Sequence, residues 1–421
     1  MSAPQPPRTT TRRFNAKREA IIAAAAWQFN RHGIKGTMLA DIAARVGLAT
    51  TSVTYYYRKK EDLAMECMMR SIAAHHELAE QAAQATDAEQ RVRAFMQLHA
   101  QMLAAHDNGQ AAELIVFDDI RALPQTHLPE AFAAYTNMFR SVRRLLEARP
   151  TDTPRAKPDR EAMNARANIL LSVTTWTRAW IGRYETDEYS RIGDRVADLL
   201  LNGLAGVGRP AWPPAAGEEG LLAALPEARN AHAESFLRAA TELVNEEGYR
   251  GASVEKIASR INLSKGSLYY EHDSKLDLVS ACFERSFALL RGALVTAERS
   301  AGSGWQRIGM VVDQLVRFQV SDRGPLLRTS AIIALPDEAR RESVRRTYER
   351  LIERIVEMIV DGMVNCSVRP CNPAIAAQML ASAVNAAAEL KRWAPNVTMD
   401  KVTALYTRPT LFGLLSSSGE G

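Results

Sequence analysis

One stretch of the chain recurs in similar form at a constant offset of 215 residues, without a gap within the stretch. Starting at Arg31 it reads RHGIKGTMLADIAARVGLATTSVTYYYRKKEDL, and starting at Glu246 it reads EEGYRGASVEKIASRINLSKGSLYYEHDSKLDL. Units of ~20–50 residues stack into solenoids, so a repeat this long indicates a duplicated domain. At 421 residues the chain is also too long for a single hydrophobic core. The repeat therefore predicts two related halves, each with its own core.

Each copy has the pattern of a helix-turn-helix. In the first copy an Ala-rich helix over residues 16–32 should end at Gly33, since glycine adopts positive φ readily. Gly47 then makes the tight turn between a short helix and a second short helix over residues 50–56. A long helix should start near Lys60 and run to about residue 84. The second copy repeats this order.

The second short helix of each copy is the predicted DNA-reading element. Its side chains are short or slender, which lets a helix enter the major groove, and flanking hydroxyl and ammonium groups can hold phosphates. These could instead be ordinary surface groups, but two aligned copies with the same polar, aromatic and basic order favour DNA binding. The predicted DNA-binding residues are Thr37, Thr50, Thr51, Ser52, Thr54, Tyr55, Tyr56, Lys59 and Lys60 in the first copy, and Ser253, Ser264, Lys265, Gly266, Ser267, Tyr269, Tyr270 and Lys275 in the second.

At these residues the sequence resembles the TetR family of bacterial regulators. The family signature near the turn is close to GVSKGTLYYHFKSKEDL, and the two copies read GLATTSVTYYYRKKEDL and NLSKGSLYYEHDSKLDL. The resemblance covers about 50 residues in each copy. It implies an all-α fold of two tandem units, each with a three-helix headpiece and a helical-bundle effector and dimerisation domain. It also implies binding to a double-stranded DNA operator and repression released by a small effector.

The two copies depart from the signature in different ways. The first has Thr50-Thr51 in place of Lys-Gly and Met38 in place of a helix-capping Thr or Ser, so we expect Thr37 to cap instead. The second keeps Ser253 as the cap but has Glu271 and Asp273 among the residues after its predicted recognition helix. The two recognition helices should therefore read different bases.

Charge separates the two headpieces. Residues 12–63 hold ten Arg or Lys and four Asp or Glu, a balance of +6, whereas residues 227–278 hold seven and nine, a balance of −2. Basic surfaces attract the DNA backbone. We therefore expect an asymmetric operator that the first headpiece binds more strongly.

The remainder of each half reads as long amphipathic helices, and motifs such as Ala122-Leu123-Pro124 and Ala334-Leu335-Pro336 show that it is duplicated too. Gly203 likewise matches Gly413. Pro and Gly in AGVGRPAWPPAAGEEG argue for a linker between the halves. The expected segments are a disordered basic arm (1–13), the first headpiece with its connecting helix (14–83), the first effector domain (84–204), the linker (205–227), the second headpiece with its connecting helix (228–299), the second effector domain (300–415) and a disordered tail (416–421).

An aromatic group in the first effector domain is the candidate effector site. Trp176 and Trp180 are one turn apart on a helix expected over residues 168–182, and further aromatics lie on neighbouring helices. A small amphipathic ligand, an acyl or aromatic compound or a CoA thioester, would fit an apolar bundle cavity flanked by arginine. Core or interface packing is the alternative for each aromatic. The candidate effector-binding residues are Phe117, Tyr135, Phe139, Trp176, Arg178 and Trp180.

Other classes of protein find little support in the sequence. It has no Gly-rich phosphate loop, no Gly-x-Ser-x-Gly and no metal-ligand spacing, so we expect no enzyme activity, no cofactor and no metal. No stretch approaches the ~18 apolar residues of a membrane span, and the four cysteines suit free thiols in a reducing cytoplasm. A CSVRPC redox pair is the lesser alternative for two of them.

Two questions stay open at this point. The chain is most simply a ligand-responsive repressor, but an architectural or adaptor protein that kept DNA binding and lost effector control has the same motifs. Its two halves could fold on each other as an intramolecular pseudo-dimer, which a short linker favours, or two tandem chains could form a homodimer with four headpieces.

Overall fold

The computed structural model describes residues 12–147, 159–208, 210–212, 231–262, 273–300 and 302–416. These residues form helices, with one isolated antiparallel bridge between Ala205 and Val368 and no β-strand among them. The predicted all-α class is confirmed. In the described part of the chain no helix is both long and apolar enough to span a membrane.

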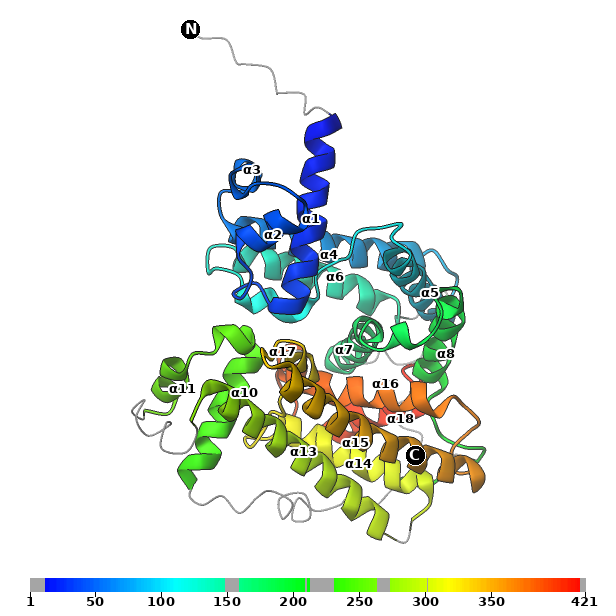
Figure 1. Cartoon of the computed structure of the whole chain (residues 1–421). Helices are drawn as coiled ribbons and strands as arrows, with labels where there is room; N and C mark the ends of the chain where they lie inside the picture. Colours follow the sequence, from blue (N-terminus) through cyan, green and yellow to red (C-terminus); the bar gives the residue numbers. More distant parts are fainter. Residues whose placement is uncertain are drawn as a thin grey trace.

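The first half consists of a headpiece, a connecting helix and a helical body (Figure 1). The headpiece and connecting helix are α1 (Arg12–His32), α2 (Leu39–Arg45), α3 (Thr50–Tyr56) and α4 (Lys60–Ala82). The body contains α5 (Ala88–Asp107), the 3₁₀ helix η1 (Phe117–Ala122), α6 (Leu128–Arg144), α7 (Arg160–Thr177), the 3₁₀ turns η2 (Ile181–Arg183) and η3 (Thr186–Glu188), and α8 (Tyr189–Asn202).

The second half repeats this order. Its headpiece and connecting helix include α10 (Ala231–Gly251), α11 (Val254–Arg260) and α13 (Lys275–Arg299). Its body contains α14 (Gly304–Val320), η4 (Thr329–Ile332), α15 (Glu338–Val364), α16 (Pro373–Ala386), η5 (Ala387–Glu389), α17 (Leu390–Trp393), the π-helix η6 (Thr403–Thr407) and α18 (Arg408–Phe412). Gly248 interrupts α10 with φ of 73°, matching Gly33 with φ of 69°, so both copies make the same turn.

The two bodies pack on each other through α7 and α8 of the first half and α16, α17, η6 and α18 of the second (Figure 1). The chain crosses itself almost reciprocally there: Leu204 N donates to Leu411 O (2.8 Å) and Leu414 N donates to Leu200 O (2.7 Å). A Cβ on Gly203 would lie 2.1 Å from Leu411 O, and one on Gly413 would lie 2.0 Å from Leu201 O. Both glycines also have positive φ, so the crossing requires glycine at both positions.

Several expected boundaries were wrong. Helix α1 begins at Arg12, inside the segment expected to be disordered, because Phe14 packs against the Tyr56 ring at 4.6 Å. The helix expected to continue to residue 182 ends at Thr177, and the chain then forms short 3₁₀ turns. The start of the expected linker is ordered, since Ala205 pairs with Val368. Residues 213–227, most of that linker, lie outside the described residues.

Candidate nucleic-acid interface

Helix α3 presents its polar face outward. Val53 is fully buried and anchors the helix to the headpiece core, whereas Thr50 and Thr51 are exposed and Tyr55 is 73% exposed. Ser52, Thr54 and Tyr56 are half-buried, and the Thr54 hydroxyl donates to Thr51 O at 2.9 Å. Figure 1 shows α3 at the outer edge of the first half, which forms the upper lobe in this view. Short side chains on an exposed helix of this kind suit entry into a major groove.

The start of α1 supports α3. Phe14 contacts the rings of both Tyr55 (6.3 Å between centroids) and Tyr56 (4.6 Å). The two tyrosines meet edge to face at 5.4 Å. Aromatic pairs in these arrangements stabilise beyond simple burial. Tyr55 therefore remains accessible while its orientation is restrained by the other two rings.

The basic residues after α3 have different environments. Arg58 and Lys59 are exposed. Lys60 instead donates from Nζ to Lys35 O (3.1 Å) and Thr37 O (2.9 Å), so its ammonium group holds the turn between α1 and α2. Thr37, also predicted to bind DNA, is 1% exposed. Both residues therefore have a structural position that the sequence pattern did not indicate.

The expectation that Thr37 caps α2 was wrong. Its hydroxyl donates to Gly33 O at 3.0 Å. The cap position is occupied by Met38, whose backbone N donates to the Asp41 carboxylate at 2.9 Å. Ser253 of the second copy does cap its helix, since its hydroxyl accepts from Lys256 N at 3.2 Å.

An ion-pair network joins α1 to α4 and reaches Tyr57, the residue that follows α3. Glu66 accepts from Arg18 Nη2 (2.5 Å) and from the Tyr57 hydroxyl (2.7 Å). Arg70 bridges Glu66 (3.4 Å) to Glu19 (2.5 Å). Burial, and then the hydrogen bond to Glu66, raise the pKa of Tyr57, so its hydroxyl remains a donor at neutral pH.

The segment predicted to form the second recognition helix, residues 265–271, lies outside the described residues. Six predicted DNA-binding residues of the second copy fall within residues 263–272, namely Ser264, Lys265, Gly266, Ser267, Tyr269 and Tyr270. Of the other predicted residues, Ser253 caps α11 and Lys275 places Nζ 4.7 Å from the centre of the Tyr249 ring.

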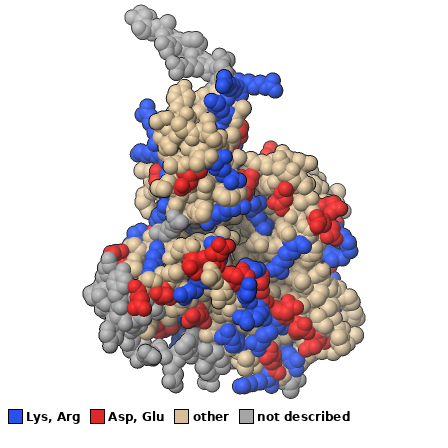
Figure 2. All heavy atoms as spheres, in the orientation of Figure 1, with Lys and Arg blue, Asp and Glu red and all other residues tan. Residues whose placement is uncertain are grey.

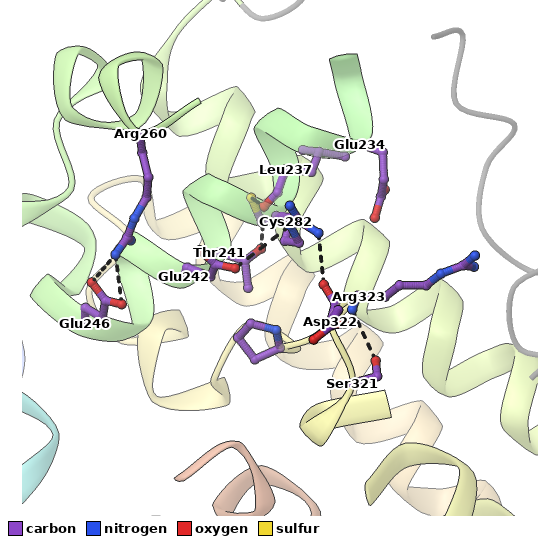
Figure 3. A network of polar contacts seen from close by, with 12 residues as sticks. Glu234, Leu237, Thr241, Glu242, Glu246, Arg260, Cys282, Ser321, Asp322 and Arg323 are labelled. Atoms are coloured by element: carbon purple, nitrogen blue, oxygen red, sulfur yellow. Dashed lines mark hydrogen bonds and ion pairs between the residues drawn. The ribbon is translucent and has the colours of Figure 1, made fainter. Parts of the chain in front are cut away.

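Basic side chains of the second headpiece are paired with acids. Arg260 contacts Glu246 at 2.9 Å (Figure 3), and Lys256 contacts Glu247 at 2.5 Å. Glu247 also binds Lys35 of the first headpiece at 2.7 Å. Figure 2 shows acidic side chains gathered along the boundary between the upper and lower lobes. These pairings reduce the attraction of the second headpiece for phosphates.

The candidate effector residues of the first body are all engaged with other side chains. Phe117 meets Tyr135 edge to face at 5.3 Å, and Trp393 of the second half meets both Tyr135 (6.1 Å) and Phe139 (stacked, 3.6 Å). The other three also have partners: Trp176 Nε1 donates to Gln378 (3.4 Å), Arg178 pairs with Glu113 (2.5 Å), and Trp180 is buried beside Tyr184 (6.3 Å). Phe139 and Trp176 thus contribute to packing between the halves.

A buried histidine cluster lies in the same body. His75 of α4 and His99 of α5 are buried with ring centroids 5.5 Å apart, and His75 also meets Phe117 at 4.9 Å. Burial lowers the pKa of His75 to about 4 and lowers that of His99 well below its ordinary value, so both rings are neutral near pH 7. Within the described structure the Nδ1 atoms of His99 and His106 have no hydrogen-bond partner.

The histidine cluster was missed because its spacing resembles no metal or catalytic motif. A comparison of the two copies of the repeat could have found the histidines. His75 matches Leu290 at the offset of 215, and aligning the N-caps Asp87 of α5 and Ser303 of α14 matches His99 to Leu315, so the second half is apolar at both positions. A polar residue that replaces leucine on an inward helix face calls for a functional explanation.

A recess of about 250 Å³ occurs in the second half, lined by Glu234, Ser235, Arg238, Arg285, Phe318 and Arg323. Two of its three arginines are already engaged. Arg285 donates to Glu234 (2.8 Å) and to Arg323 O (2.9 Å), and Arg238 donates to Asp322 O (2.9 Å). The Glu234–Arg285 pair is the counterpart of Glu19–Arg70, so it is part of the shared framework of the two headpieces.

Two helix-turn-helix units on helical bodies that share one bundle define a tandem, all-α protein with duplicated headpieces. The family described as bacterial regulatory proteins, tetR family, matches residues 21–67 and 236–282. The chain is a TetR-family regulator in tandem form.

Individual similar proteins match at low identity. The Transposon Tn10 TetC protein of Escherichia coli is 22% identical over 102 residues, 24% of this chain and 51% of that protein. The chain thus spans about half the length of this curated relative. Among solved structures, the TetR family transcriptional regulator PfmR from Thermus thermophilus is 19% identical with a TM-score of 0.35, covering 42% of this chain and 95% of that one. The putative fatty acid metabolism regulator of Clostridium perfringens is 20% identical with a TM-score of 0.35, covering 44% and 100%.

Proposed function

We propose that the chain binds operator DNA sequence-specifically through α3 of the first headpiece and represses transcription. The exposed face of this helix supports the proposal. Thr50, Thr51 and Tyr55 point outward, and the exposed Arg58 and Lys59 follow directly. This arrangement combines side chains that can reach base edges with cations that can neutralise phosphates.

We propose that one chain acts as a pseudo-dimer. The bodies already pack through α7 and α8 against α16 and α18, so the bundle faces are used within the chain. The near-reciprocal crossing at Gly203 and Gly413 supports this arrangement, because two symmetric subunits would cross in the same way. The resulting operator would be asymmetric, with the stronger half-site under the first headpiece.

We propose that a small amphipathic effector releases the DNA by binding in the first body, beside Phe117 and the buried imidazoles. The unpartnered Nδ1 atoms of His99 and His106 support this location. Each buried polar atom without a partner costs about 1–3 kcal/mol, which a hydrogen bond to a ligand would offset. An acyl or aromatic compound with one polar group fits this combination of an aromatic ring and imidazole.

An electrophoretic mobility shift tests these proposals together. We expect a preference for the chain's own promoter region over random duplex DNA at physiological salt, and loss of the shift when the effector is added. Equal binding to both DNAs would overturn the regulator. A specific shift that no acyl or aromatic compound changes would favour the adaptor alternative, which the stacking of Phe139 on Trp393 supports.

Light scattering tests the pseudo-dimer. It should give a mass near 46.5 kDa, and twice that mass would support the homodimer.

A further inference from the structure

We propose that Glu113 is a positioning residue that couples the first headpiece to its body and to the bundle between the halves, and that no side chain at the matched positions of the second half makes this three-way link. This inference rests on the proposed function, because it concerns how the state of the body reaches the DNA-binding helix. It arises from three contacts that meet at one carboxylate.

Glu113 lies in the irregular segment between α5 and η1, and its side chain is 17% exposed. It accepts from Asn30 Nδ2 (2.9 Å) and Arg31 Nη1 (3.3 Å), both in the last turn of α1. It also accepts from Arg178 Nη2 (2.5 Å), at the C-terminal end of α7. One carboxylate therefore joins the helix that leads into the helix-turn-helix to the helix that packs against the other half.

The carboxylate stays ionised in this position. Burial alone would raise the pKa of Glu113, but the hydrogen bond from Asn30 and the charges of Arg178 and Arg31 lower it overall. Charge-assisted hydrogen bonds of this kind are stronger and more directional than neutral ones. Displacing Arg178 would therefore change the hydrogen bonds that Glu113 accepts from Asn30 and Arg31.

A neutral clamp beside Glu113 is common to both halves. Asn30 Nδ2 donates to Leu114 O and its Oδ1 accepts from Val116 N, both at 2.9 Å. In the second half Asn245 makes the same pair of 2.9 Å bonds with Leu326 O and Arg328 N. The clamp attaches each headpiece to its body, so it does not distinguish the two halves.

The charged contacts of Glu113 with Arg31 and Arg178 have no equivalent at the matched positions of the second half. In register with the asparagine clamp, Pro325 takes the place of Glu113. Glu246 takes the place of Arg31, and it pairs with Arg260 inside its own headpiece. In register with Gly203 and Gly413, Ala388 takes the place of Arg178. The second half has a different charged contact: Glu389, the last residue of η5, pairs with Arg328 of the clamped segment and with Arg121 of η1 (2.7 Å). Neither pair includes a side chain of the second headpiece, which instead pairs with the first headpiece through Glu247 and Lys35 (2.7 Å).

The consequence is one-sided control. A change at the end of α7 reaches α1 through Arg178 and Glu113, and the second headpiece follows through its contact with the first. In the reverse direction, DNA bound to the first headpiece should stabilise the end of α7. Coupling of this kind is reciprocal by thermodynamic necessity.

Hydrogen–deuterium exchange on the full chain tests the link, with and without a promoter duplex of about 40 base pairs, enough for two half-sites. In the wild type, DNA should slow exchange at both α1 and residues 174–178. In Glu113→Gln the slowing at 174–178 should fall at least about tenfold, the value of one charge-assisted hydrogen bond, while protection of α3 persists. Arg178→Gln should have the same effect, and the double variant should lose no more than either single variant. The matched control is Glu246→Gln, which removes a paired acid from the second headpiece and should leave the coupling intact.

Two outcomes would overturn the inference: wild-type coupling in both Glu113→Gln and Arg178→Gln, or equal loss in Glu246→Gln. The arm without DNA separates this result from the proposed function. Even if the chain binds no DNA, exchange at residues 29–32 should quicken in Glu113→Gln and Arg178→Gln but not in Glu246→Gln. Circular dichroism confirms that each variant is folded, and Arg178→Gln tests the link from its other end if Glu113→Gln does not fold.

Discussion

The two halves share a framework of backbone contacts, neutral contacts and one ion pair, Glu19–Arg70 in the first half and Glu234–Arg285 in the second, but differ in other charges. Asn30 and Asn245 make the same clamp, and Cys67 and Cys282 both direct a buried thiol to a carbonyl of the first headpiece helix, α1 in one half and α10 in the other. The charges beside this framework have diverged. Arg31, which binds the body, is matched by Glu246, which binds within its own headpiece.

This difference indicates where the two halves have acquired different tasks. Contacts that hold the fold depend on shape and backbone geometry, so both copies keep them. Contacts that attract DNA, sense a ligand or transmit a change depend on charge and polarity. The first half has the basic headpiece, the buried imidazoles and Glu113. We infer that the first half contributes more than the second to DNA binding and to the control of that binding by a ligand.

The largest effect should come from the glycine crossing, where the halves are equivalent. Gly203→Ala and Gly413→Ala should each lower the free energy of unfolding by about 4 kcal/mol, combining ~1 kcal/mol of backbone strain with ~3 kcal/mol of overpacking. Urea unfolding measures this loss. Gly208→Ala is the matched control, because Gly208 also has positive φ (89°) but a Cβ there would meet nothing within 4 Å. If all three variants lose the same stability, the crossing does not require glycine for steric reasons.

The second largest effect should come from acid pH, which should destabilise the first half more than the second. The pKa of His75 is lowered to about 4 by burial, against an unfolded value near 6.5, so its contribution to stability is complete above pH 6.5 and is lost as the pH falls towards 4. The first half should lose roughly 2–3 kcal/mol over that range. Local hydrogen exchange at pH 7 and pH 5 measures each half separately. The second half, with Leu290 and Leu315 at the matched positions, should change less. His75→Leu should flatten the pH dependence of the first half; an unchanged slope would exclude His75 as its source.

DNA affinity should depend more on the first headpiece. The double variant Arg58→Ala and Lys59→Ala should reduce the slope of log affinity against log salt by about two units, as expected for two lost phosphate contacts. Lys265→Ala with Lys275→Ala should cost less, since the second headpiece has a balance of −2 against +6. Mobility shifts over a range of salt concentrations measure both. Equal slopes for the two double variants would contradict unequal headpieces.

The sequence was sufficient to predict the architecture. The repeat at offset 215 gave two halves, and matched glycines such as Gly203 and Gly413 marked equivalent turns, because positive φ leaves a local signature. Local patterns also placed α3 correctly at residues 50–56. Helix ends were less predictable. Helix α1 starts early because Phe14 packs on the α3 tyrosines, a contact between segments about 40 residues apart.

The candidate site was only partly predictable, for the same physical reason. No local pattern indicates that Trp393 stacks on Phe139 from 254 residues away, or that Lys60 Nζ binds backbone carbonyls instead of remaining free for phosphate. Glu113 was not a candidate, since its partners come from α1 and α7. Side-chain functions that depend on contacts between distant segments require the structure.

The smallest effect concerns the contact that joins the headpieces. Lys35 lies 2.7 Å from Glu247, with side chains 36% and 23% exposed, so the pair should contribute no more than about 1 kcal/mol. If it fixes the spacing of the headpieces, Lys35→Glu should weaken binding to a duplex with both half-sites by up to about fivefold, beyond its effect on a duplex with one half-site. Adding Glu247→Lys should restore binding, because the new glutamate at position 35 would then face the new lysine and Lys256. Lys17→Glu, on α1 of the same headpiece, controls for the change in charge. A swap that restores nothing would mean that the two headpieces adjust their spacing independently of this pair.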